Sequence, residues 1–320
     1  MTALTGFLKK LRVGQMREYE NMAIFPLLVD KYIKPAYLLP GEALEQGMLE
    51  IKEVCFEGSI NEVLVHNKSE QPVLFLDGDI LLGAKQNRVI NASILVGPRA
   101  KLKVLVSCVE ECRWRYNTAC FTISRRFSYS KMRALKNAHV TECLMFSGAF
   151  NADQFAIWDE VERKQREMRV ESSTYAVNDI YKSYEETLGK YCGVFQHGVS
   201  QVGVAVFING KFACLDALDN PASLQKLYQK LVESYALDAL EVTGREKKKV
   251  GKGALQELLD RLLAAKVSSY PSAGLGEDLR FSDINLAGSC LVLGNKVVHL
   301  AVFAGKDKGT GFLPHQFLPT

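Results

Sequence analysis

The chain has 320 residues, which is enough to bury a large core within one or two domains. Its 40 basic and 36 acidic residues leave a formal net charge of +4 at pH 7, so the composition gives no electrostatic signature of a nucleic-acid or anionic-membrane partner. No apolar run approaches the roughly 20 residues of a membrane-spanning helix, and we expect neither nucleic acid nor membrane as a partner.

Residues 1–14 are predicted to form an amphipathic helix. Leu4, Phe7, Leu8 and Leu11 recur at intervals of three and four, which is the spacing of one helical face. Basic residues interrupt this stretch and leave no apolar segment of a secretory signal. We therefore expect the helix to pack on the body of a cytoplasmic protein, whose eight scattered cysteines remain free thiols.

Residues 15 to about 150 carry mostly strand patterns. Residues 49–56 alternate apolar and polar side chains with a period of two, as a half-buried strand does. Further apolar runs, separated by turn residues, cover 22–29, 62–66, 72–76, 88–96 and 102–109. Short strands joined by turns indicate an antiparallel sheet or sandwich rather than a doubly wound parallel sheet.

The chain changes character after residue 150, where helices are expected. Asn151, with Gln154 three residues later, predicts a capping box at the start of the first helix. A second helix is predicted over 177–191. The predicted core face of the first helix consists of Phe155, Trp158, Val161 and Met168.

Hairpins and two more helices are predicted toward the C-terminus. Asn209-Gly210 between alternating apolar residues predicts a β-hairpin, because both turn positions need positive φ, and a last hairpin turns at Gly294-Asn295. Asn220 and Pro221 predict the start of a third helix, and a fourth covers 255–262. We predict one α+β domain over residues 15–303, an antiparallel β-rich N-terminal half packed with a helical C-terminal half, followed by a loose tail over 304–320.

Two carboxylates lie two residues apart in Asp77-Gly-Asp79, at the end of an apolar strand. On a continuing strand both would point to one face, where they can bind a divalent cation or divide acid and base roles. The alternative is an ordinary Asp-Gly turn with solvated carboxylates, which the spacing alone fits better.

Four long polar side chains follow at Lys85, Gln86, Asn87 and Arg88. Lysine and arginine bind phosphate or carboxylate, and the two amides can hydrogen-bond to sugar hydroxyls. This set would suit a nucleotide or sugar phosphate. A polar edge strand, protected by its charges against edge-to-edge pairing, explains it equally well.

A third cluster follows the strand over 102–109. Trp114 and Tyr116 could stack on a ring, and Arg113 could pair with Glu110 or with an anion. Cys108 would be a nucleophile only with a base beside it, and a buried strand thiol is the simpler interpretation.

The fourth cluster lies in the first turn of the first predicted helix. Asp153 and Gln154 could bind a ligand there, and capping explains them about as well. None of the five histidines has a sequence partner at catalytic spacing, and we expect His66 and His299, both in strand runs, to be structural.

Several of these sequence segments, taken together, resemble one protein family. The strings over 76–88 and 106–110, Arg113-Trp114, Asp153-Gln154 and Trp158-Asp-Glu160 are similar to the ARG- and rhodanese-phosphatase-associated protein domain family, a bacterial group. The resemblance covers about residues 15 to 303, and Asp79 departs from it where a glutamate is expected. It implies an association with ADP-ribose or other NAD-derived compounds.

We therefore predict an enzyme or a specific binder of a phosphorylated nucleotide-like small molecule, with ADP-ribose implied by the resemblance. The alternative is a non-enzymatic sensor or interaction module, in which the same side chains stabilise a loop network. The first hypothesis requires the clusters at 77–88, 107–116 and 153–160 to converge on one pocket. Predicted catalytic residues are Asp77, Asp79, Lys85 and Glu110, with Asp77 and Asp79 as the ligands of any divalent cation, and predicted ligand-binding residues are Gln86, Asn87, Arg88, Arg113, Trp114, Asp153 and Gln154.

Overall fold

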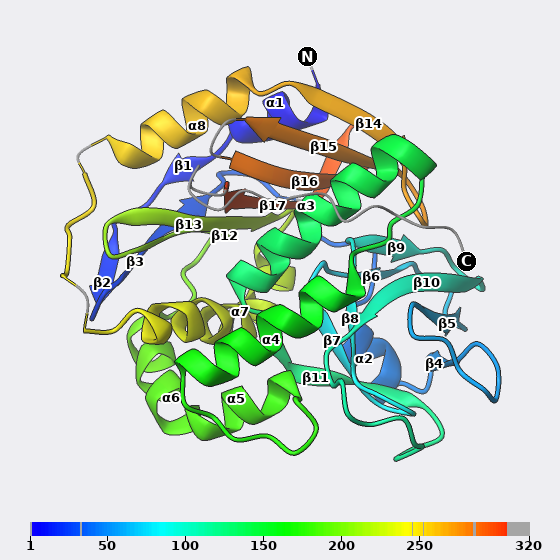
Figure 1. Cartoon of the computed structure of the whole chain (residues 1–320). Helices are drawn as coiled ribbons and strands as arrows, with labels where there is room; N and C mark the ends of the chain where they lie inside the picture. Colours follow the sequence, from blue (N-terminus) through cyan, green and yellow to red (C-terminus); the bar gives the residue numbers. More distant parts are fainter. Residues whose placement is uncertain (1, 33, 245, 252, 284–285, 306–320) are drawn as a thin grey trace.

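The computed structural model describes residues 2–305, apart from residues 33, 245, 252 and 284–285. Within that part of the chain, antiparallel sheets and eight helices make a mixed α+β fold (Figure 1). The predicted α+β class is confirmed. The tail expected over 304–320 lies, from residue 306 onward, outside the described residues.

A nine-stranded sheet takes its strands from both ends of the chain (Figure 1). The turns predicted at Asn209-Gly210 and Gly294-Asn295 join two of its hairpins, and both are confirmed. Six of the nine strands follow residue 200 and three helices precede residue 150, so helices and strands are interspersed and the second half is not purely helical. The strand order is β1 (Arg12–Val13), β3 (Met22–Leu28), β12 (Gln201–Ile208), β13 (Lys211–Leu218), β17 (Lys296–Ala304), β16 (Leu286–Leu293), β15 (Glu277–Asp283) and β14 (Val267–Pro271), with β2 (Arg17–Tyr19) paired to β3.

A six-stranded sheet is built from the first half of the chain, as predicted. The single strand expected over 88–96 is instead divided between two sheets, with a break at residues 91–93. The order of the six-stranded sheet is β11 (Phe121–Phe127), β7 (Asp79–Gly83), β8 (Arg88–Ile90), β10 (Lys101–Cys108), β5 (Glu62–Asn67) and β4 (Leu49–Glu53), and β6 (Val73–Phe75) pairs separately with β9 (Ile94–Val96).

Helices cover both faces of the nine-stranded sheet, and one helix, over residues 40–45, packs instead on β4, β6 and β11 (Figure 1). The helices are α1 (Ala3–Leu8), α2 (Pro40–Glu45), α3 (Ser130–Ser147), α4 (Gln154–Glu167), α5 (Val177–Ser183), α6 (Glu185–Val194), α7 (Pro221–Glu241) and α8 (Ala254–Ala264). Helices α1 and α8 cover one face, where Leu4 and Leu8 share an apolar core with Leu258 and Leu300. An N-terminal helix with a buried apolar face is therefore present, but it ends at Leu8, and Arg12 and Val13, predicted to be helical, form strand β1 instead. Among the described helices, none is both long and apolar enough to cross a membrane.

Helices α3 and α7 lie against the other face of this sheet, and α7 also contacts β11 of the six-stranded sheet. The start of α7 is as predicted. The Asn220 side chain accepts a hydrogen bond from the Ser223 N–H, and Pro221 is the first residue of the helix. Helix α3 was not predicted. Its buried face mixes Arg133, Lys136 and Asn137 with Met132, Val140 and Leu144, so apolar periodicity alone does not reveal it.

The first helix predicted after residue 150 differs from α4 in its cap and its face. Asp153, not Asn151, is the N-cap. Phe155, predicted in the core, is 74% exposed, and Ile157 is buried instead. The buried face of the helix is therefore rotated about the helix axis from the predicted one. The second predicted helix is interrupted at Tyr184, which separates α5 from α6.

Candidate functional site

The first group of predicted site residues surrounds a buried ion pair between Glu110 and Arg113. The Arg113 Nη2 atom lies 2.7 Å from Glu110 Oε2, and both side chains are about nine-tenths buried. Glu110 Oε2 also accepts the backbone N–H of Asn87 at 3.1 Å. Arg113 donates to the carbonyl oxygens of Gly83 and Ala84. The pair therefore fixes the turn from β7 to β8, which carries the polar run.

Arg88 lies at the end of this turn and is fully buried. Its guanidinium donates to Gln86 Oε1 at 2.8 Å and to the carbonyl oxygen of Ser59 at 3.2 Å. It also lies 3.9 Å from Glu53 Oε1. Burial lowers the pKa of Arg88. Because both terminal nitrogens face protein acceptors, Arg88 is placed to hold the loop together rather than to meet a phosphate from solvent.

Gln154 and Asp153 connect helix α4 to the end of β10. The Gln154 amide donates to the carbonyl oxygen of Cys108 at 2.9 Å and accepts the Cys108 N–H at 2.7 Å. Asp153 accepts the N–H groups of Phe155 and Ala156, so it caps the helix. Both side chains therefore have structural partners at the positions where ligand binding was predicted.

Lys85 lies among three aromatic rings at the surface. Its Nζ atom lies 5.2 Å from the ring centroids of Trp114 and Tyr116 and 5.7 Å from that of Phe56. It donates to the carbonyl oxygen of Glu57 at 2.6 Å. Phe56 is 80% exposed, Trp114 45% and Tyr116 41%. We call these three rings and Lys85 the ring cluster.

The Glu53 carboxylate lies next to the ring cluster. Its Oε1 atom accepts the backbone N–H of Lys85 at 3.2 Å, while its buried Oε2 atom has no hydrogen-bond partner. A Cβ atom added to Gly58 would lie 3.3 Å from Glu53 Oε2, 3.1 Å from Lys85 Cδ and 3.4 Å from a ring carbon of Trp114. These groups thus surround one point, and only the small size of Gly58 lets the loop approach it. Neither Glu53 nor Phe56 was predicted as a site residue, since both lie within the strand predicted over 49–56.

Asp77 is paired elsewhere, with Lys136 of helix α3. The Lys136 ammonium donates to Asp77 Oδ1 and, at 2.9 Å, to the carbonyl oxygen of Asn91, and both charged side chains are buried. Burial lowers the pKa of Lys136 to about 8, although Asp77 opposes the shift. Asp77 Oδ2 has no hydrogen-bond partner.

Asp79 closes the turn and pairs with helix α7. Its Oδ2 atom accepts the N–H of Leu76 at 2.8 Å, and its Oδ1 atom accepts from Lys230. Residues 85–88, 110–114 and 154 therefore lie against one another, whereas Asp77 and Asp79 pair elsewhere, and the single pocket that the first hypothesis requires stays a prediction. A protein ammonium already neutralises each of these carboxylates, and the described residues contain no group of three or more metal-ligating side chains that could hold a metal ion.

A family model, that of the ARG and Rhodanese-Phosphatase-superfamily-associated Protein domain, matches residues 10–303. The chain belongs to this family. A search of curated proteins and a search of solved structures gave no match. In this member of the ARG- and rhodanese-phosphatase-associated family, the strings that carried the resemblance around residues 85–88, 106–114 and 153–154 fold against one another.

A second polar network of this family member was not predicted from the sequence. Arg133 makes two hydrogen bonds with Asp216, at 2.7 and 2.8 Å, and its guanidinium carbon lies 4.9 Å from the ring centroids of both Phe127 and Phe303. Burial alone would raise the pKa of Asp216, yet Arg133 holds it well below its usual range. The network joins helix α3 to β13 in the centre of the fold.

His299 extends this network to Ser93. The His299 Nε2 atom lies 3.4 Å from Asp216 Oδ1, and its Nδ1 atom lies 2.7 Å from Ser93 Oγ. Serine, histidine and aspartate in series are also the parts of a nucleophile relay. Here all three are buried, and Arg133 already neutralises Asp216, so the arrangement fits the structural role expected of His299. No sequence spacing could reveal it, because the partners lie far apart in the chain.

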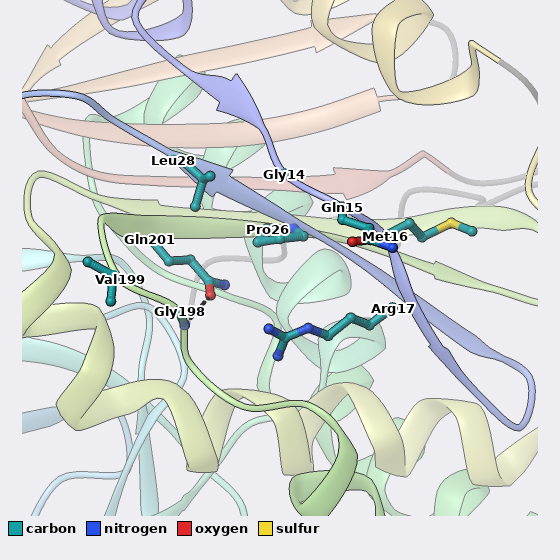
Figure 2. A pocket seen from close by; sticks show the side chains of 9 residues that line it. All are labelled: Gly14, Gln15, Met16, Arg17, Pro26, Leu28, Gly198, Val199 and Gln201. Carbon is teal, nitrogen blue, oxygen red and sulfur yellow. Dashed lines mark hydrogen bonds between the residues drawn. The ribbon is translucent and has the colours of Figure 1, made fainter.

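A surface cavity of about 400 Å³ lies away from both networks. Figure 2 shows it between β3, the segment before β2 and the turn ahead of β12, with the Arg17 guanidinium extending toward Gly198 and Gln201. The cavity is open and none of the predicted site residues lines it. It therefore does not supply the pocket that the first sequence hypothesis required.

Cysteine labelling tests the placement of the strings around β10. Cys108 is buried and its pKa is raised by burial, whereas Cys55 and Cys112 are exposed. We expect iodoacetamide to label Cys55 and Cys112 in the native protein and to label Cys108 only after unfolding. Peptide mass spectrometry measures this directly, and early labelling of Cys108 in the native state would contradict the burial of the β10 end.

Proposed function

We propose that the protein is a specific binder of a phosphorylated nucleotide-like ligand, of which ADP-ribose is an example, and that the ligand binds at the ring cluster. The observation that carries this proposal is the exposure of Phe56, Trp114 and Tyr116 side by side around one ammonium. Stacking of a base on an aromatic side chain contributes about 1–3 kcal/mol. Exposed rings of this kind offer such a platform.

Lys85 supplies the charge that a phosphate group needs. Its ammonium has one described hydrogen-bond acceptor, the Glu57 carbonyl oxygen, and its stem is only half-buried. A lysine side chain has several rotatable bonds, so the ammonium can turn from the rings toward a phosphate bound beside them. Charge-assisted hydrogen bonds of this type are about twice as strong as neutral ones.

Binding is proposed ahead of catalysis because the predicted acidic residues are engaged. Glu110 is paired with Arg113, Asp77 with Lys136 and Asp79 with Lys230. A carboxylate held by a protein cation in this way is not positioned to take a proton from a bound substrate. The same pairing favours the second candidate function, a sensor that changes its loops or its partners when ligand binds.

A cytoplasmic location belongs to the same proposal. All eight cysteines are free, and three of them, Cys108, Cys214 and Cys290, are buried. Unpaired thiols in these numbers suit a reducing compartment.

Replacing Trp114 with alanine is the direct test. We expect the variant to bind ADP-ribose about 5- to 150-fold more weakly than wild type, because a stacking surface that contributes about 1–3 kcal/mol is removed. Isothermal titration calorimetry, supported by thermal-shift measurements, gives the two dissociation constants.

Phe155→Ala is the matched control for this test. Phe155 is also an exposed ring, but it lies on helix α4 outside the ring cluster. Its removal should leave ADP-ribose binding unchanged. Absence of binding to the wild-type protein, or an equal loss in both variants, would count against the proposed function.

A further inference from the structure

The Lys85 ammonium is held by the groups that proteins use to bind organic cations. Three ring faces lie 5.2–5.7 Å from it, and a backbone carbonyl oxygen accepts its hydrogen bond. The negative face of an aromatic ring attracts a cation within about 6 Å, and cages of such rings recognise quaternary ammonium groups. The ring cluster is thus a cation site that the protein fills with its own side chain.

A buried carboxylate oxygen strengthens this preference. Glu53 Oε2 lies beside Lys85 and Trp114 at the Gly58 position and has no hydrogen-bond partner. The Glu53 side chain is 3% exposed, so water does little to screen it. An unpaired buried acceptor is costly, and a nearby positive charge lowers that cost. Glu53 Oε2, the Glu57 carbonyl oxygen and the ring faces therefore all favour positive charge.

Arg88 also lies near this site, with its guanidinium carbon 5.5 Å from the Trp114 ring centroid. It is fully buried and fixed by Gln86 and Ser59. Lys85 is half-buried and held by one hydrogen bond. An exchange of cations at the ring cluster would therefore involve Lys85 and leave Arg88 in place.

We infer that the ligand group entering the ring cluster is itself cationic, an ammonium or an N-alkylated aromatic ring, and that it displaces Lys85. The inference rests on the proposed function for the location of the ligand, and it narrows the ligand class, because ADP-ribose itself carries no cationic group. A cation that replaces Lys85 keeps a positive charge against the Phe56 and Tyr116 rings. A neutral group would leave Arg88, among the described residues, as the one cation near Glu53 and Trp114 and none against the other two rings. The displaced ammonium then becomes free to bind the ligand's phosphate.

A pair of probes that differ in one atom tests the charge. Phosphocholine carries a quaternary ammonium and a phosphate, and 3,3-dimethylbutyl phosphate is its neutral carbon analogue. We expect the full-length protein to bind phosphocholine about 3- to 30-fold more tightly, which is the factor that one cation–π site contributes. Equal dissociation constants by calorimetry would overturn the inference.

Removal of Lys85 tests the displacement. In Lys85→Ala, choline without phosphate should bind several-fold more tightly than to wild type, because its internal competitor is gone. Phosphocholine should gain less, because its phosphate loses a partner. Lys103→Ala is the control, since Lys103 is an exposed lysine of β10 outside the ring cluster. If Lys85→Ala does not fold, Lys85→Met keeps the apolar stem and carries the same expectation. Unchanged choline binding would contradict displacement.

The experiments distinguish failure of the proposed function from failure of the cationic ligand group. If phosphocholine is preferred over its neutral analogue but ADP-ribose does not bind, the nucleotide-like ligand is wrong and the cation site stands. If ADP-ribose binds through Trp114 while both phosphate probes bind equally, the proposed function stands and the cationic group is wrong.

Discussion

Replacing Arg133 with methionine is expected to lower the free energy of unfolding by about 3–5 kcal/mol, which is the range for removing one partner of a buried ion pair. The variant leaves the Asp216 carboxylate buried, with the hydroxyl of Tyr235 at 2.6 Å as its remaining strong donor. It also removes the cation that packs against Phe127 and Phe303. Guanidinium chloride unfolding of both proteins at pH 7 measures the difference.

Arg12→Met is the control for this experiment. Arg12 pairs with Asp30, but these side chains are 60% and 67% exposed. An exposed pair contributes about 0–1 kcal/mol, so this variant should unfold almost like wild type. The double variant Arg133→Met/Asp216→Leu should recover much of the loss, because no buried charge is left unpaired. Equal stabilities of Arg133→Met and Arg12→Met would show that the Arg133 pair does not hold the fold together.

Lys136→Met is expected to destabilise the protein by a similar amount, about 3–5 kcal/mol at pH 7, and to change its pH dependence. Without the ammonium, Asp77 is a buried charge whose Oδ2 atom already lacks a partner. In the wild type, the folded pKa of Lys136 is about 8, below the ordinary value of 10.5. Between these two pH values the unfolded chain binds more protons than the folded one, so the Lys136 contribution to stability rises with pH.

Unfolding curves at several pH values from 7 to 10.5 test this expectation. The difference in unfolding free energy between wild type and Lys136→Met should grow above pH 8, because only the wild type contains the group that titrates there. Taking the difference removes the other groups that titrate in this range. Lys103→Met, at an exposed lysine, should show no such change. A difference independent of pH would contradict the lowered pKa of Lys136.

The elements that could be predicted are those whose buried face is apolar or whose turns need a special backbone. The Asn209-Gly210 hairpin has positive φ at both positions, as its residues require. Helix α7 begins at Pro221 after the Asn220 cap, as predicted, and buries Leu224, Leu227 and Leu231. Helix α3 was missed for the opposite reason, because charged and amide side chains interrupt the apolar residues of its buried face. Pattern reasoning assigns such residues to the surface unless their partners are known.

In the candidate site, contacts within one sequence segment could be predicted, and contacts between distant segments could not. Residues near one another in the sequence strings, such as Glu110 and Arg113, could be expected to meet. The pairing of Asp77 with Lys136 could not, because it depends on a helix that the sequence did not reveal. The Glu53 carboxylate and the Phe56 ring reach Lys85 only through the way β4 and its following loop pack beside the turn from β7 to β8.

The nine-stranded sheet has a consequence for how the chain is made. Strand β3 lies between β1 and β12, and its residue Leu28 pairs with Gln201. More than half of the chain must therefore leave the ribosome before β3 obtains its central neighbour. Pairings between residues so distant in sequence form slowly, and until then an apolar strand has an open edge. We expect the nascent N-terminal segment to be the part of this protein that chaperones bind during synthesis.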